Sequence, residues 1–84
     1  MEYKRFEIDL SVANNDLKLD FGGVYSSYHI VRYDVDFQYR INSINSPQIY
    51  ASEIGGFDKE SAFKELYITN TPQAAGSKAV IVVF

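Results

Sequence analysis

The chain has 84 residues, of which 46% are hydrophobic and 23% are charged, and it contains no cysteine. This composition is too apolar for a disordered chain, and it excludes disulfides and thiolate metal sites. The 8 basic and 11 acidic residues leave a net charge of −3, whereas nucleic-acid-binding proteins usually gather a basic excess on one face. We therefore expect no nucleic-acid partner.

The chain also lacks any segment of the roughly 18 apolar residues that a membrane span requires, and its N-terminus does not resemble a signal peptide. We expect a soluble domain without a membrane partner. A chain of this length buries only roughly 60 to 65% of its unfolded surface. Small domains usually compensate with disulfides, metals or partner subunits. With no cysteine, association of several copies is the remedy that we expect.

Two strands are predicted before residue 22. Residues 3–12 alternate, with an apolar face that includes Phe6, Ile8, Leu10 and Val12. Turn-forming residues follow at 13–16. The second strand then has Leu17, Leu19 and Phe21 on one face and Lys18 and Asp20 on the other, and it is expected to stop at Gly22-Gly23.

The most regular part of the chain is the segment Val31–Ile41. Residues 24–30 before it are β-prone but alternate poorly, which predicts a bulge or bend near Ser26-Ser27. From Val31 onward apolar and polar residues alternate without a break, so one face is apolar and aromatic and the other is charged and hydrogen-bonding. We expect this strand to form the centre of the core, against which the C-terminal strand closes. The polar face comprises Arg32, Asp34, Asp36, Gln38 and Arg40.

Shorter elements are predicted in the second half of the chain. Residues 42–47 form a turn, residues 48–53 a short extended piece that ends at Gly55-Gly56, and Asp58–Ser61 a polar loop with room for one helical turn. Residues 63–69 form a strand, and residues 70–76 the next turn. The final run 79–84 is apolar throughout, which predicts burial on both faces by the domain or by a neighbouring subunit.

Six or seven short strands without a helix-length periodic segment predict an all-β fold. We expect a small antiparallel β-sandwich or jelly-roll-like barrel that forms one domain, residues 1–84.

Catalytic, cofactor and metal sites are not predicted. His29 is the sole histidine, so a transition-metal site is not expected. Ser26, Ser27, His29 and Asp34 include the residue types of a hydrolytic triad, but no nucleophile-elbow glycine pattern surrounds either serine. Asp34 and Asp36 are neighbours on one strand face and offer oxygen ligands for calcium. Arg32 and Arg40 lie on the same face of the same predicted strand, and the competing interpretation is that these charges pair across strands or remain solvated.

Interaction surfaces are the better supported candidates. Aromatic residues make up 15% of the chain, and exposed tyrosines stack on sugars or form subunit contacts. The charged strand face is the second candidate docking surface. The predicted interface residues are Tyr25, Tyr28, Tyr50, Tyr67, Arg32, Asp34, Asp36 and Arg40.

Two segments resemble a pattern found in small structural proteins of tailed-bacteriophage virions. Residues 63–77 contain a strand of the type leucine, tyrosine, aliphatic, threonine, asparagine, then a glutamine-alanine-glycine turn that leads to the final apolar strand. Residues 6–13 resemble the opening of that pattern, an aliphatic-Asp-Leu-Ser strand before a polar turn. This sequence departs from it at Pro72, at the doubled Ala74-Ala75, and throughout its middle section.

The resemblance implies a β-sandwich subunit located in a phage particle, in its capsid decoration, neck, tail or fibre. Such a subunit is not an enzyme, has no cofactor, and binds other virion proteins and copies of itself. The alternative is a carbohydrate-binding module that uses exposed tyrosines, and a small hydrolase built around His29 is less favoured.

Overall fold

The structure, a computed structural model, describes residues 3–54 and 56–84. It confirms the all-β class, with six antiparallel strands in one hydrogen-bonded sheet and one short helix in that part of the chain. No helix among these residues is long and apolar enough to cross a membrane. The elements are β1 (Lys4–Asp9), β2 (Asn14–Tyr33), β3 (Gln38–Ile41), β4 (Ile49–Tyr50), α1 (Ala51–Ile54), β5 (Gly56–Asn70) and β6 (Lys78–Val83).

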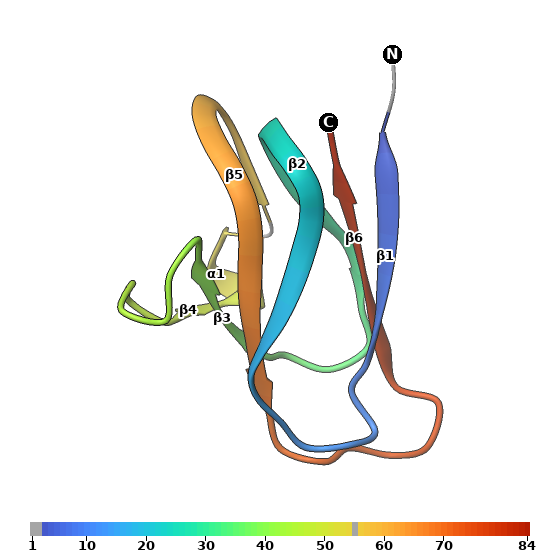
Figure 1. Cartoon of the computed structure of the whole chain (residues 1–84). Helices are drawn as coiled ribbons and strands as arrows, with labels where there is room; N and C mark the ends of the chain where they lie inside the picture. The colour runs from blue at the N-terminus through green and yellow to red at the C-terminus, as the bar shows by residue number, and fades with distance from the viewer. Residues whose placement is uncertain (1–2, 55) are drawn as a thin grey trace.

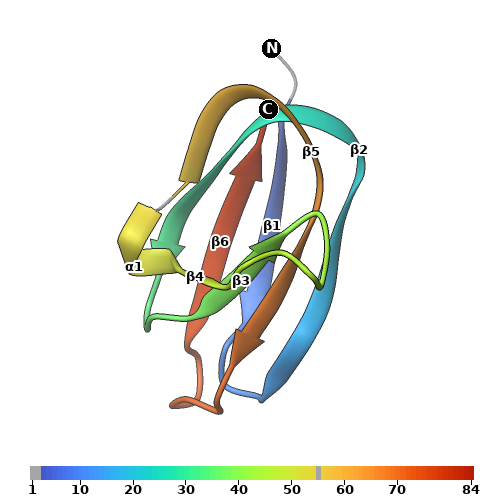
Figure 2. The same ribbon diagram turned by 90° about the vertical axis from the view of Figure 1, so that its left-hand side faces the viewer.

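The sheet folds over itself into a small sandwich-like arrangement. Its strand order is β1-β6-β2-β5-β3-β4, and the long strands β2 and β5 bend so that each runs through both layers (Figure 1). The first part of β2 pairs with β5, and its last part, from Tyr28 to Tyr33, pairs with β6. One layer therefore contains β1, β6 and the end of β2, and the other contains the start of β2, most of β5 and β3 (Figure 2).

The core lies between these layers. Its largest fully buried side chains come from four different strands and the β1–β2 connection, which explains why the two layers stay together. These side chains are Tyr28, Tyr39, Phe21, Leu10, Leu66, Ile68, Ile81 and Val83.

The predicted continuous strand Val31–Ile41 is wrong. β2 ends at Tyr33 and β3 begins at Gln38, because the pairing of β2 with β6 ends at Asp34. The Asp34 backbone N–H donates to the Lys78 carbonyl at 3.0 Å, and the Asp34 carboxylate accepts from the Lys78 N–H at 2.9 Å. The predicted apolar face is divided as a result. Phe37 and Tyr39 are core residues, whereas Val31 and Tyr33 are 60% and 40% exposed.

The predicted end of the second strand at Gly22-Gly23 is also wrong, because β2 continues through both glycines. Gly22 has φ +76°, and a Cβ built on it would lie 2.9 Å from the Lys4 Nζ. The left-handed backbone favours glycine here and bends β2 without ending it. The bulge expected near Ser26-Ser27 is confirmed by a register shift between Tyr25 and Ser27.

The polar loop predicted at Asp58–Ser61 is part of β5, whose backbone pairs with β2. Gly55, the first glycine of the predicted Gly55-Gly56 stop, lies outside the described residues. The short extended piece before it is present as β4, followed by the single turn of α1.

The C-terminal strand is covered by the domain as predicted, whereas its burial on both faces is incomplete, because Val82 on the outer face is only partly buried. β6 lies between β1 and β2 in the sheet, and Ala79, Val80, Ile81 and Val83 are all buried. The chain itself covers this apolar run, since β6 has a hydrogen-bonded neighbour on each side and the core against one face.

Candidate interaction surface

Arg32 and Asp34 form an ion pair within one segment of chain. The Arg32 Nε and Nη2 donate to the two Asp34 carboxylate oxygens at 2.9 and 3.0 Å. These hydrogen bonds, and the N–H of Lys78, hold the pKa of Asp34 below its usual value, and the carboxylate in turn raises the pKa of Arg32. Both residues are exposed, so this part of the predicted interface is accessible.

Replacement of Asp34 by asparagine is expected to remove a pH-dependent part of the stability. The lowered pKa means that the unfolded chain binds the proton more readily, so this stabilisation is present above about pH 4 and is lost as pH falls through the folded-state pKa. Urea unfolding at several pH values should show the largest gap between wild type and Asp34→Asn near neutral pH, closing in acid. A gap that does not change with pH would contradict this account.

Asp36 has a different set of partners. Its carboxylate accepts hydrogen bonds from the Phe37 N–H at 3.0 Å and from the Ser52 N–H and hydroxyl at 3.0 and 2.7 Å. Asp36 therefore ties the start of α1 to the segment before β3. The two carboxylates proposed as calcium ligands are thus bound to separate groups, and the described residues contain no cluster of three or more acidic, histidine or cysteine side chains that could hold a metal ion.

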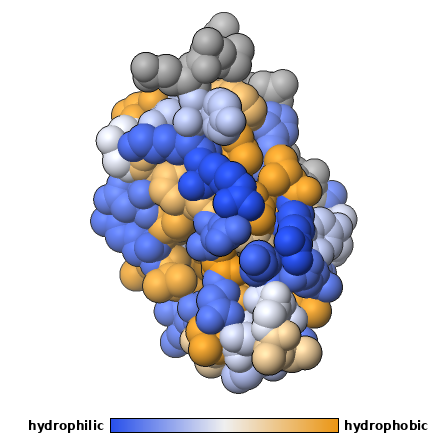
Figure 3. All heavy atoms as spheres, turned by 90° about the vertical axis from the view of Figure 1, so that its right-hand side faces the viewer, coloured by the Kyte–Doolittle hydropathy of each residue, from blue (hydrophilic) through white to orange (hydrophobic). Residues whose placement is uncertain are grey.

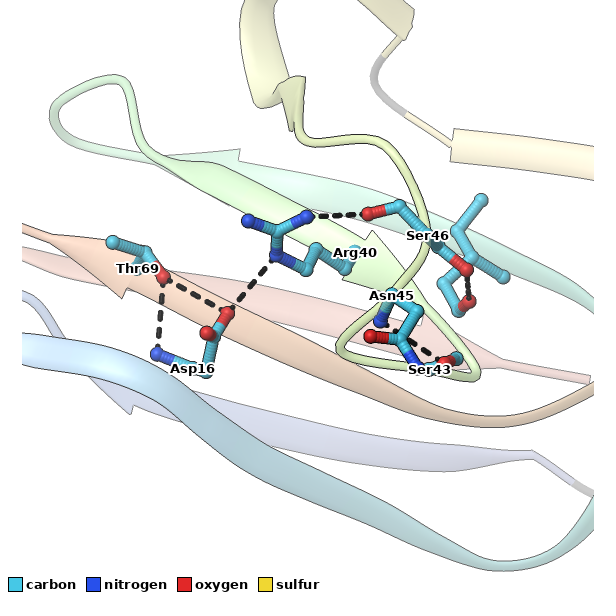
Figure 4. A network of polar contacts seen from close by, with 7 residues as sticks. Asp16, Arg40, Ser43, Asn45, Ser46 and Thr69 are labelled. Carbon is cyan, nitrogen blue, oxygen red and sulfur yellow. Dashed lines mark hydrogen bonds and ion pairs between the residues drawn. The ribbon is translucent and has the colours of Figure 1, made fainter.

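Arg40 joins three strands rather than facing a partner. Its Nε donates to Asp16 at 3.2 Å, and its Nη1 donates to the Ser46 carbonyl (Figure 4). The Asp16 N–H donates to the Thr69 hydroxyl at 3.0 Å. The network connects β2, β3 and β5, and only a quarter of the Arg40 side chain is exposed. A structural role therefore accounts for Arg40.

The four predicted tyrosines differ in their exposure. Tyr28 is fully buried, so its predicted exposure is wrong; its hydroxyl lies 2.9 Å from that of Tyr39, and burial raises the pKa of both phenols. Tyr67 donates to Glu65 at 2.6 Å, which raises the pKa of the Tyr67 phenol. Tyr25 is half-buried, and Tyr50 is 47% exposed. Tyr50 is therefore the one best placed to meet a ligand.

Tyr50 lies at an open cleft of about 510 Å³, located where β4, the end of β5 and the start of β2 meet. Carboxylate, amide and hydroxyl groups beside an aromatic ring are the groups that bind hydroxyl-rich ligands. The lining residues with such side chains are Tyr50, Asp36, Gln38, Asn14, Asn15, Asn70, Thr69 and Thr71.

The triad residue types are not joined by hydrogen bonds within the described part of the chain. The His29 ring meets the ring of Phe84 edge-on at 5.7 Å, and the Ser26 hydroxyl donates to the Phe84 carbonyl at 3.4 Å. Asp34 is bound to Arg32 and Lys78. These contacts account for the three side chains without a nucleophile–base pair.

Asn14 and Asn70 were identified from the sequence only as turn residues. In the structure the Asn14 amide donates to the Asn70 side-chain oxygen at 2.7 Å, and both line the cleft. They are 56 positions apart, and nothing in the sequence indicates that the first residue of β2 pairs with the last residue of β5.

Comparisons with protein families, with curated proteins and with solved structures find no match for this chain. The resemblance to virion proteins therefore stays a prediction based on residues 6–13 and 63–84.

Proposed function

We propose that this chain is a non-enzymatic structural subunit of a tailed-bacteriophage particle, a capsid-decorating, neck or tail-associated protein. It acts through contacts with other virion proteins and with copies of itself. The observation that supports the proposal most is that the two segments carrying the resemblance form one joint in the fold.

That joint centres on the carbonyl oxygen of Leu10. The backbone N–H of Gln73 donates to this oxygen at 3.1 Å, and the side-chain amide of Asn70 donates to it at 3.1 Å and to the Val12 carbonyl at 3.0 Å. Gly76, with φ +86°, allows the same loop to turn back into β6. The asparagine and glutamine of the pattern thus bind the end of its first segment, and the glycine turns the chain back into β6, so all three residues serve the same joint.

The surface composition is compatible with subunit contacts. Hydrophilic and hydrophobic side chains are intermixed on the face that carries β1 and β6 (Figure 3). Several large apolar side chains are at least 40% exposed, among them Val24, Val31 and Ile44. Mixed surfaces of this kind are typical of interfaces between folded subunits.

Mass spectrometry of particles purified on a density gradient tests the proposal. The chain should be present at a constant ratio to the major capsid protein, while a non-structural phage enzyme from the same lysate should be absent. Loss of the chain during purification, with capsid and tail proteins retained, would overturn the proposal.

The cleft beside Tyr50 favours carbohydrate binding as a second candidate function. An exposed ring next to amide and carboxylate groups matches the needs of a sugar, whose C–H face stacks on the ring while its hydroxyls form hydrogen bonds.

If the cleft binds sugar, Tyr50→Ala should weaken binding roughly tenfold, since stacking contributes about 1 kcal/mol or more. Glycan-array screening followed by calorimetry on the best ligand is the measurement. Tyr33→Ala is the matched control, because Tyr33 is also an exposed tyrosine but does not line the cleft. An array without signal, or equal losses in both variants, would remove this candidate.

A further inference from the structure

β1 lies at one end of the sheet and is paired on one side only. All six of its residues pair with β6, and in an antiparallel pair alternate residues turn their backbone N–H and C=O groups away from the partner. The Leu10 N–H donates to the Ser77 carbonyl at 2.9 Å, in continuation of that register. Arg5, Glu7 and Asp9 are therefore the residues whose backbone groups face the open edge.

A second contact agrees with this assignment. The carbonyl oxygen of Asp9 accepts a hydrogen bond from the side chain of Asn14 at 3.0 Å, from outside the β1–β6 pair. The backbone groups of Arg5 and Glu7 have no such internal cover in the described part of the chain. Their side chains are about half exposed and form an ion pair with each other at 3.1 Å.

We propose that β1 pairs with β1 of a second copy of this chain, antiparallel and about a two-fold axis at Phe6. In this register Arg5 lies opposite Glu7 of the second copy, and Glu7 lies opposite Arg5. About four backbone hydrogen bonds form between the outward-facing groups. The six-stranded sheet of each copy becomes half of one continuous sheet.

The charges on β1 select this register over its neighbours. A two-fold axis at residue 5 would place Arg5 opposite Arg5, and an axis at residue 7 would place Glu7 opposite Glu7. An axis at residue 8 would place Glu7 opposite Asp9. Like charges directly opposite one another are destabilising, whereas opposite charges attract, so the axis at Phe6 is favoured.

The inward-facing residues are compatible with the pairing. Phe6 is half-buried against Phe21, with ring centroids 5.6 Å apart, and the axis would bring it close to Phe6 of the second copy. The Lys4 ammonium group is held by the Phe21 carbonyl of its own chain at 3.1 Å, which keeps this charge bound within its own copy.

The other edges of the sheet are poorer candidates. β4, at the opposite end, has two residues. The unpaired side of the first half of β2 is interrupted by left-handed backbone at Asp16 and Gly22, and such irregularities hinder edge pairing. β1 has a regular backbone over its six residues.

Charge reversal tests the register. Arg5→Glu and Glu7→Arg should each weaken dimerisation roughly tenfold, because each variant places like charges opposite one another twice. The double variant should recover wild-type association, and an equimolar mixture of the two single variants should form a mixed dimer. Sedimentation velocity over a concentration series is the measurement, and Lys64→Glu, an exposed lysine on β5, is the control for charge change.

Disulfide trapping gives a second test that does not depend on affinity. Because the chain has no cysteine, Arg5→Cys and Glu7→Cys chains can be mixed under mild oxidation. The mixed disulfide dimer should form several times faster than either homodimer. A monomeric wild type at high concentration, single reversals that dimerise normally, or cross-linking without this preference would each overturn the pairing.

The inference rests on the proposed function, assembly of several copies in a particle, for its biological meaning. The experiments separate the two proposals. The chain can be present in purified particles although β1 does not pair, and β1 can pair in solution although the chain is absent from every particle.

Discussion

Ile81→Ala is expected to lower the free energy of unfolding by about 3 kcal/mol. Ile81 is fully buried at the middle of β6, the strand that joins β1 to β2. Removal of its outer carbons loses apolar burial and leaves a cavity that close packing cannot refill, for which losses of about 2 to 5 kcal/mol are typical. In a domain of this size the melting temperature should fall by roughly 12 to 24 °C.

Val82→Ala is the matched control for Ile81. Val82 is the next residue of the same strand, so its side chain lies on the outer surface of the layer, where it is only partly buried. It pairs with Arg5 of β1 and with His29 of β2. Its truncation should cost about 1 kcal/mol. Chemical denaturation and calorimetry measure both variants. Equal losses at the two positions would contradict the assignment of the inner and outer faces of β6.

Asn70→Asp is expected to destabilise the fold by roughly 2 kcal/mol although the side chain keeps its shape. The Asn70 amide group donates to the Leu10, Val12 and Thr71 carbonyls, and the Asn70 oxygen accepts from Asn14. A carboxylate cannot donate these bonds and places negative charge against carbonyl oxygens, which is costly at a partly buried site.

Acid should restore part of the stability lost in Asn70→Asp. The carbonyl oxygens favour the protonated carboxyl group, so its pKa is expected to rise in the folded state. The charge penalty then shrinks as pH falls below the folded-state pKa and is gone below the unfolded-state pKa of about 4. Thermal unfolding at several pH values is the measurement. Asn45→Asp, in the exposed loop before β4, introduces the same charge and should change stability by less than about 0.5 kcal/mol. Similar losses in the two variants would contradict the role of the joint.

The joint that supports the virion proposal and the cleft that favours sugar binding share residues at one end of the molecule. Asn70 and Asn14 hold the joint between the β1–β2 and β5–β6 connections, and they also line the cleft beside Tyr50. Variants at Tyr50 are therefore the cleaner probe of sugar binding, because Tyr50 does not take part in the joint. Variants at Arg5 and Glu7 probe subunit pairing at a separate edge of the sheet.

The predicted exposure is confirmed for Arg32, Asp34, Asp36 and Tyr50, and their role in an interface stays a prediction. Arg32 and Asp34 pair with each other within one segment of chain, not across strands. Tyr28 and Arg40 were expected on the surface, but the folding of one layer over the other buries Tyr28 against Tyr39. Arg40 binds Asp16 across β5, within one layer. The cleft brings together the ends of strands that are distant in sequence, β2, β3, β4 and β5, and no spacing along the chain indicates such a meeting.

The sequence by itself determined the all-β class, the bulge near Ser26-Ser27 and the burial of the C-terminal strand, because alternation and uninterrupted apolar runs report which sides of a strand lie away from water. Only the tertiary structure decided where strands change partners. The apolar alternation from Val31 to Ile41 continues across the break at Asp34, but the buried side does not: Val31 and Tyr33 are exposed, whereas Phe37 and Tyr39 are core residues. Likewise, Gly22-Gly23 bends β2 rather than ending it, because β5 pairs with the strand on both sides of the bend. Side-chain periodicity indicates extended backbone, whereas the ends of strands and the side that each strand buries are fixed by contacts with neighbours that are distant in sequence.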